Sequence, residues 1–313
     1  MSRSIGIVTA EVISSALVIN NQVHGPVRTF PTEDDVADDL VSYPADVLIQ
    51  KICEVLESTP GHDTVDCIGL GFPGLIRDNI VEESPNYRQM KGVRLGDAVK
   101  SALAAKGINA NILVSNDADV VAAGIAASRG QLDRLIRVWT LGNGIGFGHY
   151  PSGASMWEGG HTVVTLDPKE QFCGCGGTGH LEGIMGHRAM RLRFLDLEPE
   201  EIFENANEGD ARCAEFVKLW HRALAAATAS SVHMDGPGKF YITGPSANFL
   251  NLSMLHQYMA EMVKISPLQG YVFEIVPGGN EIAILGAAVA AQQAAAAAAA
   301  AVTAAAVSSP ATA

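Results

Sequence analysis

Residues 158–182 read EGGHTVVTLDPKEQFCGCGGTGHLE. The side chains in this stretch that bind transition metals are His161, Cys173, Cys175 and His180. Structural zinc takes four nitrogen and sulfur ligands in a tetrahedron, and thiolate with imidazole suits zinc better than magnesium or calcium. Because the intervening glycines allow a tight loop, the spacing predicts a structural zinc site. The alternatives are a free Cys-x-Cys pair in a flexible loop, and a shell that water completes while His180 faces solvent.

The remaining cysteines support the metal interpretation. The chain has five cysteines, of which Cys53, Cys67 and Cys213 stand alone in apolar or helical patterns. We expect these three to be buried free thiols. An odd number of cysteines favours metal binding over a disulfide framework.

The charge and the apolar runs exclude some classes of function. The formal net charge is -13 at pH 7 over 313 residues, with no dense run of Lys or Arg. Such a chain repels phosphate backbones, so we expect no nucleic-acid partner. Glu11 interrupts the first apolar run too early for a signal peptide, and no strongly apolar stretch of about 18 residues stands out. The sequence predicts a cytoplasmic protein with no membrane partner.

The spacing of apolar residues in the first half predicts strands alternating with helices. The order is β-β-β-α-β-α-β-α, with Asn20–Asn21 as a hairpin turn and a helix that opens directly from a strand at Asp117. The expected strands are 5–9, 12–19, 23–30, 66–72 and 111–116, and the expected helices before Asp117 are 44–57 and 93–106.

The second half repeats this order loosely, beginning with a strand, a glycine turn and a second strand at 134–153. The expected helices are 182–193, 198–206, 208–229, 248–262 and 281–293, and the expected strands are 239–244 and 271–276. We therefore predict an α/β protein of two lobes, with a ligand cleft between them. The lobes are 1–118 with 282–293, and 119–281; the Ala-rich tail 294–313 is assigned no function.

Several of these motifs together resemble the ROK family of bacterial sugar kinases. The family pattern is Glu-x-Gly-His and then Cys-x-Cys-Gly-x-x-Gly-Cys-x-Glu, which residues 158–161 and 173–182 follow with His180 in place of the third cysteine. Further matches are 68–74 (IGLGFPG), 84–86 (SPN), 115–118 (SNDA), 140–146 (TLGNGIG) and 285–288 (LGAA). The resemblance covers nearly the whole chain. It implies a two-lobed fold like actin and hexokinase (ribonuclease H-like), a zinc-binding loop, and a homodimer formed through the larger lobe.

Asp117 is the candidate catalytic residue. Transfer of a phosphoryl group to a sugar hydroxyl needs a base near that hydroxyl. At the junction of a strand and a helix, an aspartate can serve as such a base or as the helix N-cap, and the residues alone leave both roles open. The resemblance implies that Asp117 is the general base of a kinase that phosphorylates a hexose or amino sugar.

The resemblance also implies two sets of binding residues. Sugar would bind Asn86, Asn116, Glu158, His161 and Glu182, with His161 using one ring nitrogen for zinc and the other for a sugar hydroxyl. The zinc would organise the loop rather than activate water. Mg-ATP would be the phosphate donor, held by backbone amides at Gly142, Asn143, Gly144 and Gly244. Taken alone, the glycine turn is equally a tight hairpin.

The first phosphate-binding turn departs from the family pattern. The family has Asp-x-Gly-Gly-Thr after its first strand, whereas residues 6–12 here read GIVTAEV. A Cβ in place of glycine blocks the approach of phosphate, and Glu11 repels it. Asn143 also stands where the family usually has threonine, and residues 243–246 read TGPS rather than a run of glycines.

Three hypotheses follow from this uneven match. The first is a ROK sugar kinase with unusual phosphate handling. The second is a sugar-binding ROK protein that has lost ATP binding, and the third is a sugar-processing enzyme that reuses the Asp117 cleft. A ROK transcriptional repressor is disfavoured, because that branch carries a helix-turn-helix ahead of the first strand.

Overall fold

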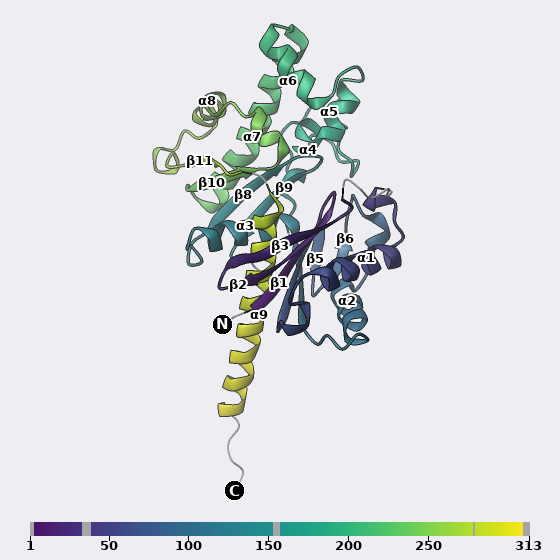
Figure 1. Ribbon diagram of the computed structural model, residues 1–313. Helices are drawn as coiled ribbons and strands as arrows, with labels where there is room; N and C mark the ends of the chain where they lie inside the picture. Colours follow the sequence, from purple (N-terminus) through teal and green to yellow (C-terminus); the bar gives the residue numbers. More distant parts are fainter. Residues whose placement is uncertain (1–2, 33–38, 153–156, 278, 309–313) are drawn as a thin grey trace. The chain divides into compact units, whose positions relative to one another are not determined.

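The computed structural model describes residues 3–32, 39–152, 157–277 and 279–308. The chain forms two compact units: Met1–Leu135 with His149–Met156 and Gly279–Ala313, and Ile136–Gly148 with Trp157–Gly278 (Figure 1). The lobes expected from the sequence stay a prediction. The compact units differ from them in placing residues 119–135, 149–156 and 279–281 with the first unit. Of the expected tail, residues 309–313 lie outside the described residues.

The first unit is built on a mixed sheet with the strand order β3-β2-β1-β4-β7. Its strands are β1 (Arg3–Thr9), β2 (Ile13–Ile19), β3 (Gln22–Phe30), β4 (Cys67–Phe72) and β7 (Asn111–Asn116). The pairs β1–β2 and β2–β3 are antiparallel, whereas β1–β4 and β4–β7 are parallel. The predicted turn between β2 and β3 is confirmed by Asn20 and Asn21, whose φ angles of 50° and 59° are those of a two-residue hairpin.

Helices cover both faces of this sheet. On one face, Ile5 and Ile7 of β1 pack in a core with α1 (Ala45–Ser58) and α2 (Leu95–Ala104). On the other, Val8 packs in a core with α3 (Asp117–Ser128) and α9 (Asn280–Ser308). The alternation of side chains along β1 divides the strand between the two cores.

Helix α9 lies directly on backbone atoms of its neighbours. A Cβ on Gly6 or Gly69 of the sheet would stand 1.8 Å from the carbonyl oxygen of Ile284 or Ala287. A Cβ on Gly286 of α9 would stand 1.7 Å from the carbonyl oxygen of Val120 in α3. Glycine at these positions therefore permits the close packing that holds β1, β4, α3 and α9 together.

The same helix is long and apolar enough, over Asn280–Ala301, to cross a membrane by length and composition, where the sequence analysis expected no such stretch. The first half of α9 is apolar because it is buried in the core of the first unit, where Ile284, Ala288 and Val289 are at most 2% exposed. Beyond residue 295 the described side chains are exposed, and the helix continues past the sheet (Figure 1). We interpret α9 as a core helix with an exposed alanine-rich extension.

The second unit has a sheet with the strand order β11-β10-β8-β9. Its strands are β8 (Ile136–Leu141), β9 (Ile145–Tyr150), β10 (Lys239–Thr243) and β11 (Val272–Ile275), and its helices are α4 (Glu182–Met185), α5 (His187–Arg193), α6 (Pro199–Glu208), α7 (Ala211–Asp235) and α8 (Leu252–Met262). Trp139, Trp220 and Phe240 are buried in its core. The expected helix 182–193 is interrupted at Gly186, whose backbone is extended (φ -68°, ψ 145°).

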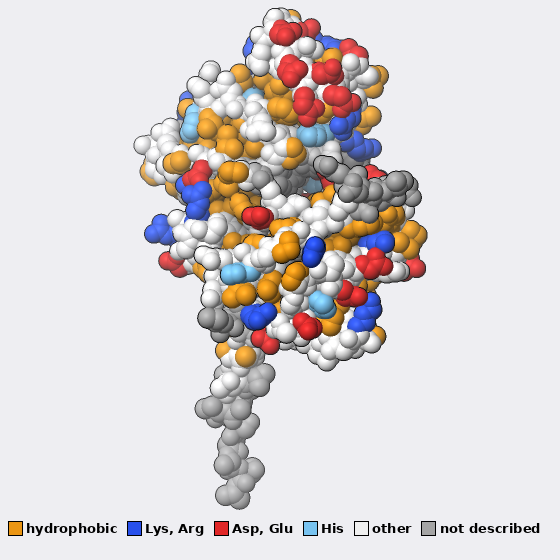
Figure 2. Space-filling view, in the orientation of Figure 1, with side chains coloured by type: hydrophobic (Ala, Val, Ile, Leu, Met, Phe, Trp, Pro, Cys, Tyr) orange, Lys and Arg blue, Asp and Glu red, His pale blue; other side chains and the backbone are white. Residues whose placement is uncertain are grey.

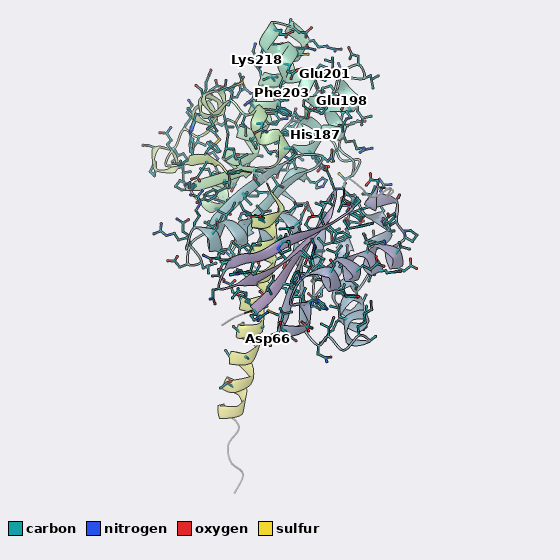
Figure 3. The ribbon with its side chains drawn as sticks, in the orientation of Figure 1. Asp66, His187, Glu198, Glu201, Phe203 and Lys218 are labelled. Atoms are coloured by element: carbon teal, nitrogen blue, oxygen red, sulfur yellow. The ribbon has the colours of Figure 1, made fainter. Side chains whose placement is uncertain are left out.

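Helix α6 shows how local sequence sets an element's start. Pro199 is its first residue, and the side chains of Glu198 and Glu201 form a reciprocal capping box (Figure 3). Glu200, Glu204 and Glu208 are exposed on the same helix, and acidic side chains gather on this part of the surface (Figure 2). This surface carries part of the chain's net negative charge.

The remaining elements are short. They are the hairpin β5 (Leu75–Arg77) and β6 (Ile80–Glu83), which the sequence analysis did not predict, and the 3-10 helices η1 (Leu40–Ser42), η2 (His62–Thr64), η3 (Arg88–Met90), η4 (Gly159–His161), η5 (Pro245–Phe249) and η6 (Ser266–Leu268).

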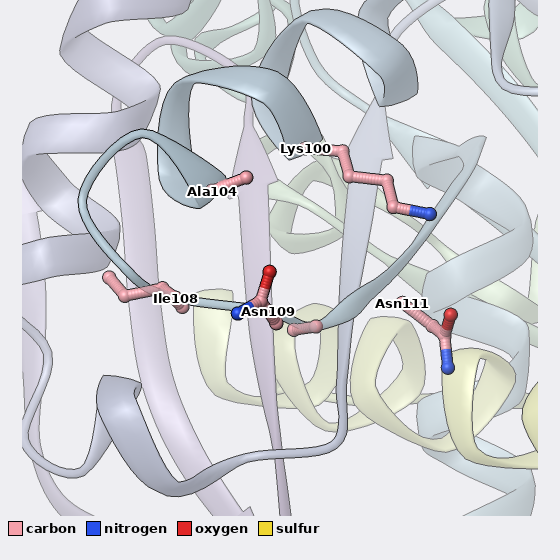
Figure 4. Close-up of a pocket in the computed structure, with 6 residues that line it drawn as sticks. Lys100, Ala104, Ile108, Asn109 and Asn111 are labelled. Carbon is pink, nitrogen blue, oxygen red and sulfur yellow. The ribbon is translucent and has the colours of Figure 1, made fainter.

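A cavity of about 220 Å³ lies beside the start of β7 (Figure 4). It is lined by Lys100, Ala104, Ile108, Asn109, Ala110 and Asn111. Asp117 follows the opposite end of the same strand, so this cavity is separate from the candidate catalytic residue.

Candidate functional site

Four side chains in the second unit come together as a candidate metal-binding cluster. Nδ1 of His161 lies 3.2 Å from Nδ1 of His180 and 3.5 Å from Sγ of Cys173. Sγ of Cys175 lies 3.4 Å from Sγ of Cys173 and 3.2 Å from Nδ1 of His180. A tetrahedron with metal–sulfur bonds of about 2.3 Å and metal–nitrogen bonds of about 2.0 Å has edges of roughly 3.3–3.8 Å. These four separations are close to those edges, and all four ligand atoms lie within 4.8 Å of one another, so the cluster could hold one tetrahedral ion.

The loop that carries the cluster closes on itself. Val163 and His180 form an antiparallel bridge, flanked by hydrogen bonds from Val164 N to Gly179 O (2.8 Å) and from Leu181 N to Thr162 O (3.0 Å). Gly179 has a φ of 73°, and its Cβ would stand 2.0 Å from the carbonyl oxygen of Thr165. The expected role of the loop glycines is thus visible in the close approach of the two arms.

Arg193 of α5 contacts two residues of this loop, and these contacts were not predicted from the sequence. Its guanidinium forms an ion pair with Glu170 and lies 4.4 Å from the centre of the Phe172 ring. Both Arg193 and Glu170 have side chains less than 20% exposed. No spacing rule links an arginine on a later helix to a loop residue 23 positions earlier, so only the folded chain reveals this contact.

The two histidines present the same ring nitrogen to the cluster. Because Nδ1 of His161 faces the other ligands, its Nε2 is directed away from them. This orientation is the one that the predicted double role of His161 requires. Burial lowers the pKa of His180, which favours the neutral imidazole that binds metal.

Glu182 joins the cluster to the glycine turn between β8 and β9. Its Oε1 lies 3.7 Å from Sγ of Cys173, and its Oε2 accepts a hydrogen bond from Ile145 N at 3.1 Å. A Cβ on Gly144 would stand 3.0 Å from the same Oε2. Glu182, which is predicted to bind sugar, thus lies against Gly144, whose backbone is predicted to bind phosphate, and bonds to the next residue, Ile145.

Glu158 lies just before η4, and its carbonyl oxygen accepts a hydrogen bond from His161 N at 3.0 Å. The two glycines that follow press against β9: a Cβ on Gly160 would stand 1.9 Å from Ile145 O, and one on Gly159 would stand 2.2 Å from Cβ of Phe147. The backbone between Glu158 and His161 therefore packs directly against β9.

The predicted phosphate turn is tight. Gly142 N donates to Gly144 O at 3.1 Å, and Asn143 is exposed at its tip. Gly244, after β10, has a φ of 97° and would clash through a Cβ with Leu141 O at 2.3 Å. Gly142 and Gly244 therefore lie on neighbouring strand ends of the second unit.

In the first unit, Asn116 and Asp117 stand at the carboxyl end of β7. Oδ1 of Asn116 accepts hydrogen bonds from Ala118 N (2.9 Å) and Asp119 N (3.2 Å), so Asn116 is the N-cap of α3. Its Nδ2 donates to Gly74 O at 2.9 Å. The N-cap interpretation of Asp117 is therefore wrong. The expected sugar contact of Asn116 stays a prediction, although most of its amide is engaged within the protein.

Asp117 has the electrostatics of a base candidate. Burial raises the pKa of its carboxyl group, while a hydrogen bond from Ala118 N (3.0 Å) acts in the opposite direction. A raised pKa makes a carboxylate a better proton acceptor, as general-base catalysis needs.

A buried tyrosine near Asp117 is a further residue that the sequence analysis missed. Ser84 donates to Pro73 O at 2.8 Å and accepts from Tyr87 N at 3.3 Å. Asn86 lies between these two residues and is exposed. The Tyr87 hydroxyl donates to Ala10 O in the turn between β1 and β2. Burial, together with the carboxylates of Asp39, Asp117 and Glu11, raises the pKa of Tyr87.

The β1–β2 turn itself is short. Thr9 pairs with Ile13, so only residues 10–12 connect the strands, and Ala10 N donates to Val12 O at 3.1 Å. This turn, fixed by Tyr87, has no glycine at which a phosphate could approach the backbone closely.

Comparison with known proteins finds sequence similarity to sugar kinases. Among curated proteins, the chain is 28% identical over 261 residues to a glucokinase from Pyrobaculum calidifontis, covering 77% of this chain and 84% of that protein. It is 31% identical over 128 residues to an N-acetylmannosamine kinase from Escherichia coli, covering 37% of this chain and 43% of that protein.

The fold is also found in solved structures. A ROK hexokinase from Thermus thermophilus superposes with a TM-score of 0.73 at 20% identity, covering 94% of this chain and 99% of that chain. The predicted α/β fold class is thereby confirmed. The profile of the ROK family matches residues 39–294, so the chain belongs to the ROK family.

Proposed function

We propose that this protein is a carbohydrate kinase that phosphorylates a hydroxyl group of a hexose or amino sugar, with Asp117 as general base. Family membership and the similarity to a glucokinase support the reaction class. The assignment of Asp117 rests on the different roles of two neighbouring residues at the carboxyl end of β7. Asn116 caps α3, and Asp117 keeps a half-buried carboxylate with a raised pKa beside it.

In the proposed reaction, Asp117 takes the proton of the sugar hydroxyl as that oxygen forms a bond to the transferred phosphorus. The bond between phosphorus and the bridging oxygen of the donor breaks, and the donor leaves as the diphosphate. Magnesium bound to ATP would neutralise charge on the phosphates. In the second unit, Glu158, Glu182 and Nε2 of His161 would bind sugar hydroxyls, and the Gly142–Gly144 turn would receive phosphate.

We also propose that the metal of the cluster is zinc and that its role is structural. All four ligands come from the protein, which is typical of a closed structural site rather than a catalytic one. When bound, the ion would fix the loop that carries His161 and Glu182. Purified protein should contain about one zinc ion per chain.

The test of the base is the substitution Asp117→Asn. It should lower turnover by about 10²- to 10⁴-fold in a coupled assay with Mg-ATP and a panel that starts with glucose and N-acetylmannosamine. Sugar affinity, measured by calorimetry, should change little. The matched control is Asp119→Asn on the same helix, whose side chain can still accept the 2.9 Å hydrogen bond from His149 N. Undiminished turnover in Asp117→Asn would remove Asp117 as the base.

A second function is favoured by the β1–β2 turn. The short hairpin, its lack of glycine and the nearby Glu11 all oppose a phosphate at this place. They support a sugar-binding protein without ATP binding. Calorimetry with Mg-ATP, with and without sugar, separates the two functions. Sugar binding without nucleotide binding would replace the kinase proposal with this one.

A further inference from the structure

His187 and Ser246 form a buried pair that the proposed chemistry does not use. Nε2 of His187 lies 2.6 Å from Oγ of Ser246, a hydrogen bond between residues 59 positions apart. His187 is 8% exposed and Ser246 is fully buried. His187 is the first residue of α5 in the second unit (Figure 3), and Ser246 lies in η5, just after β10.

The pair encloses the glycine turn between β8 and β9. His187 N donates to Gly142 O at 3.2 Å. On the other side, a Cβ on Gly142 would stand 3.3 Å from Cγ of Pro245, the residue before Ser246. The contacts thus run in a closed ring from the turn to His187, from His187 to Ser246, and from Pro245 back to the turn.

A neighbouring glycine makes this approach possible. Gly186 precedes His187, and a Cβ there would stand 2.8 Å from Asn143 O. The start of α5 therefore lies directly against the turn backbone. Glu182 holds Ile145, the residue after Gly144, by accepting a hydrogen bond from Ile145 N.

A glycine turn needs such support if it is to bind phosphate. Glycine loses more backbone entropy on ordering than any other residue, so a turn with Gly142 and Gly144 is not fixed by its own sequence. Backbone amides contribute to binding and catalysis when they are held in place beforehand. The complete burial of Ser246 favours a supporting role over direct contact with a ligand.

We propose that His187 and Ser246 are positioning residues that hold the Gly142–Ile145 turn in the conformation that receives the phosphate donor. This inference rests on the proposed kinase function for the identity of the ligand. The ordering of the turn by the pair can be measured without turnover.

The first measurement is amide hydrogen exchange of the ligand-free protein. In Ser246→Ala and His187→Ala, the amides of Asn143–Ile145 should exchange faster than in the wild type. Because the two side chains act as one unit, the double variant should be no faster than either single variant. His187→Gln, which retains hydrogen-bonding groups of similar reach, should restore part of the protection.

The matched control is His221→Gln in the same unit. His221 is also buried and bonded on both sides, to Val217 O at 2.8 Å and to Asn251 N at 2.8 Å, and neither partner belongs to the turn. This variant should lose overall stability without faster exchange at the turn. Equal exchange in the wild type and both alanine variants would overturn the proposal, as would equal acceleration in the control.

The second measurement is steady-state kinetics with Mg-ATP. Ser246→Ala should raise the KM for the donor about three- to tenfold, the equivalent of one hydrogen bond, and leave the KM for sugar within twofold. An equal rise for sugar and donor would indicate general loosening and overturn the assignment to the donor. If the wild type bound no nucleotide, the proposed function would fail, and the exchange data would still decide whether the pair orders the turn.

Discussion

Asn116 and Asp117 are adjacent residues that share the donor Ala118 N and differ in their other contacts. The amide of Asn116 bonds to the start of α3 and to Gly74, while the carboxylate of Asp117 stays in a desolvated position. A single side chain could not both cap the helix and accept a proton from substrate, since a capping carboxylate is stabilised in its ionised form. The order of these two residues therefore decides which one is available for chemistry.

His180 stands where the family pattern has its third cysteine, so this single residue shows whether histidine can replace that ligand. His180 directs Nδ1 to His161 and Cys175. We expect His180→Cys to retain about one zinc ion per chain, because a thiolate is an equally suitable ligand. His180→Ala should lose most of the metal and lower the melting temperature of the second unit.

Metal analysis by mass spectrometry, together with thermal unfolding, checks this prediction. His62→Ala is the control, since His62 lies in η2 of the first unit. Full metal content in His180→Ala would show that this histidine is not a ligand.

His221 predicts a dependence of stability on pH. Burial lowers its pKa, and its Nε2 accepts a hydrogen bond from Asn251 N, which the protonated ring cannot do. The unfolded state therefore binds the proton more readily than the folded state. The contribution of His221 is complete above the unfolded pKa of about 6.5 and is lost as the pH falls below it. Urea unfolding between pH 5 and pH 7.5 should show a steeper loss for the wild type than for His221→Gln. Parallel curves would contradict this.

At the scale of elements, the sequence predicts existence and type well. The strands of both sheets and the start of α3 at Asp117 follow from apolar spacing and turn residues. The hairpin of β5 and β6 was missed because its strands are short and its stabilising contact is distant. Asn79 accepts a hydrogen bond from Val114 N at 2.7 Å and donates to Ile112 O at 3.3 Å, so β7 supports this hairpin through a side chain.

The candidate site was predictable where its residues are close in sequence. The four metal-binding residues lie within 20 positions, and the structure brings them together. Tyr87, Arg193 and the His187–Ser246 pair were not predictable, because their partners are 23 to 77 positions away. Such contacts depend on tertiary packing and leave no periodic signal.

The packing of α9 on α3 gives a prediction at the same scale. A Cβ at position 286 has no room beside Val120 O and Gly124 N. Gly286→Ala should therefore lower the free energy of unfolding of the first unit by about 1–3 kcal/mol or more. The control is Gly270→Ala, where the nearest atom to a new Cβ is 3.9 Å away. Chemical denaturation measures both, and equal stability of the two variants would contradict the packing argument.

At the scale of the whole molecule, the exposed half of α9 should be dispensable. The last side-chain anchors are Gln292, which donates to Ser4 Oγ, and Gln293, which donates to Tyr150 Oη, both at 2.6 Å. Truncation after residue 295 should leave the melting temperature and sugar binding unchanged. Truncation after residue 291 removes both anchors and should lower the melting temperature by several degrees. Equal melting temperatures for the two truncations would show that the anchors contribute little.

The close packing of α9 on Gly6 and Gly69 also sets an order of events during synthesis. The second unit apart from Ile136–Gly148 is the continuous stretch Trp157–Gly278, so all of its residues have been made before α9 begins. On the sheet face that α3 and α9 cover, β1 and β4 stay without α9 until residues 280–291 leave the ribosome, although α3 is made earlier. The first unit thus completes its core only after all of the second unit has been made, and the apolar sheet face that awaits α9 is open to non-native contacts in the meantime.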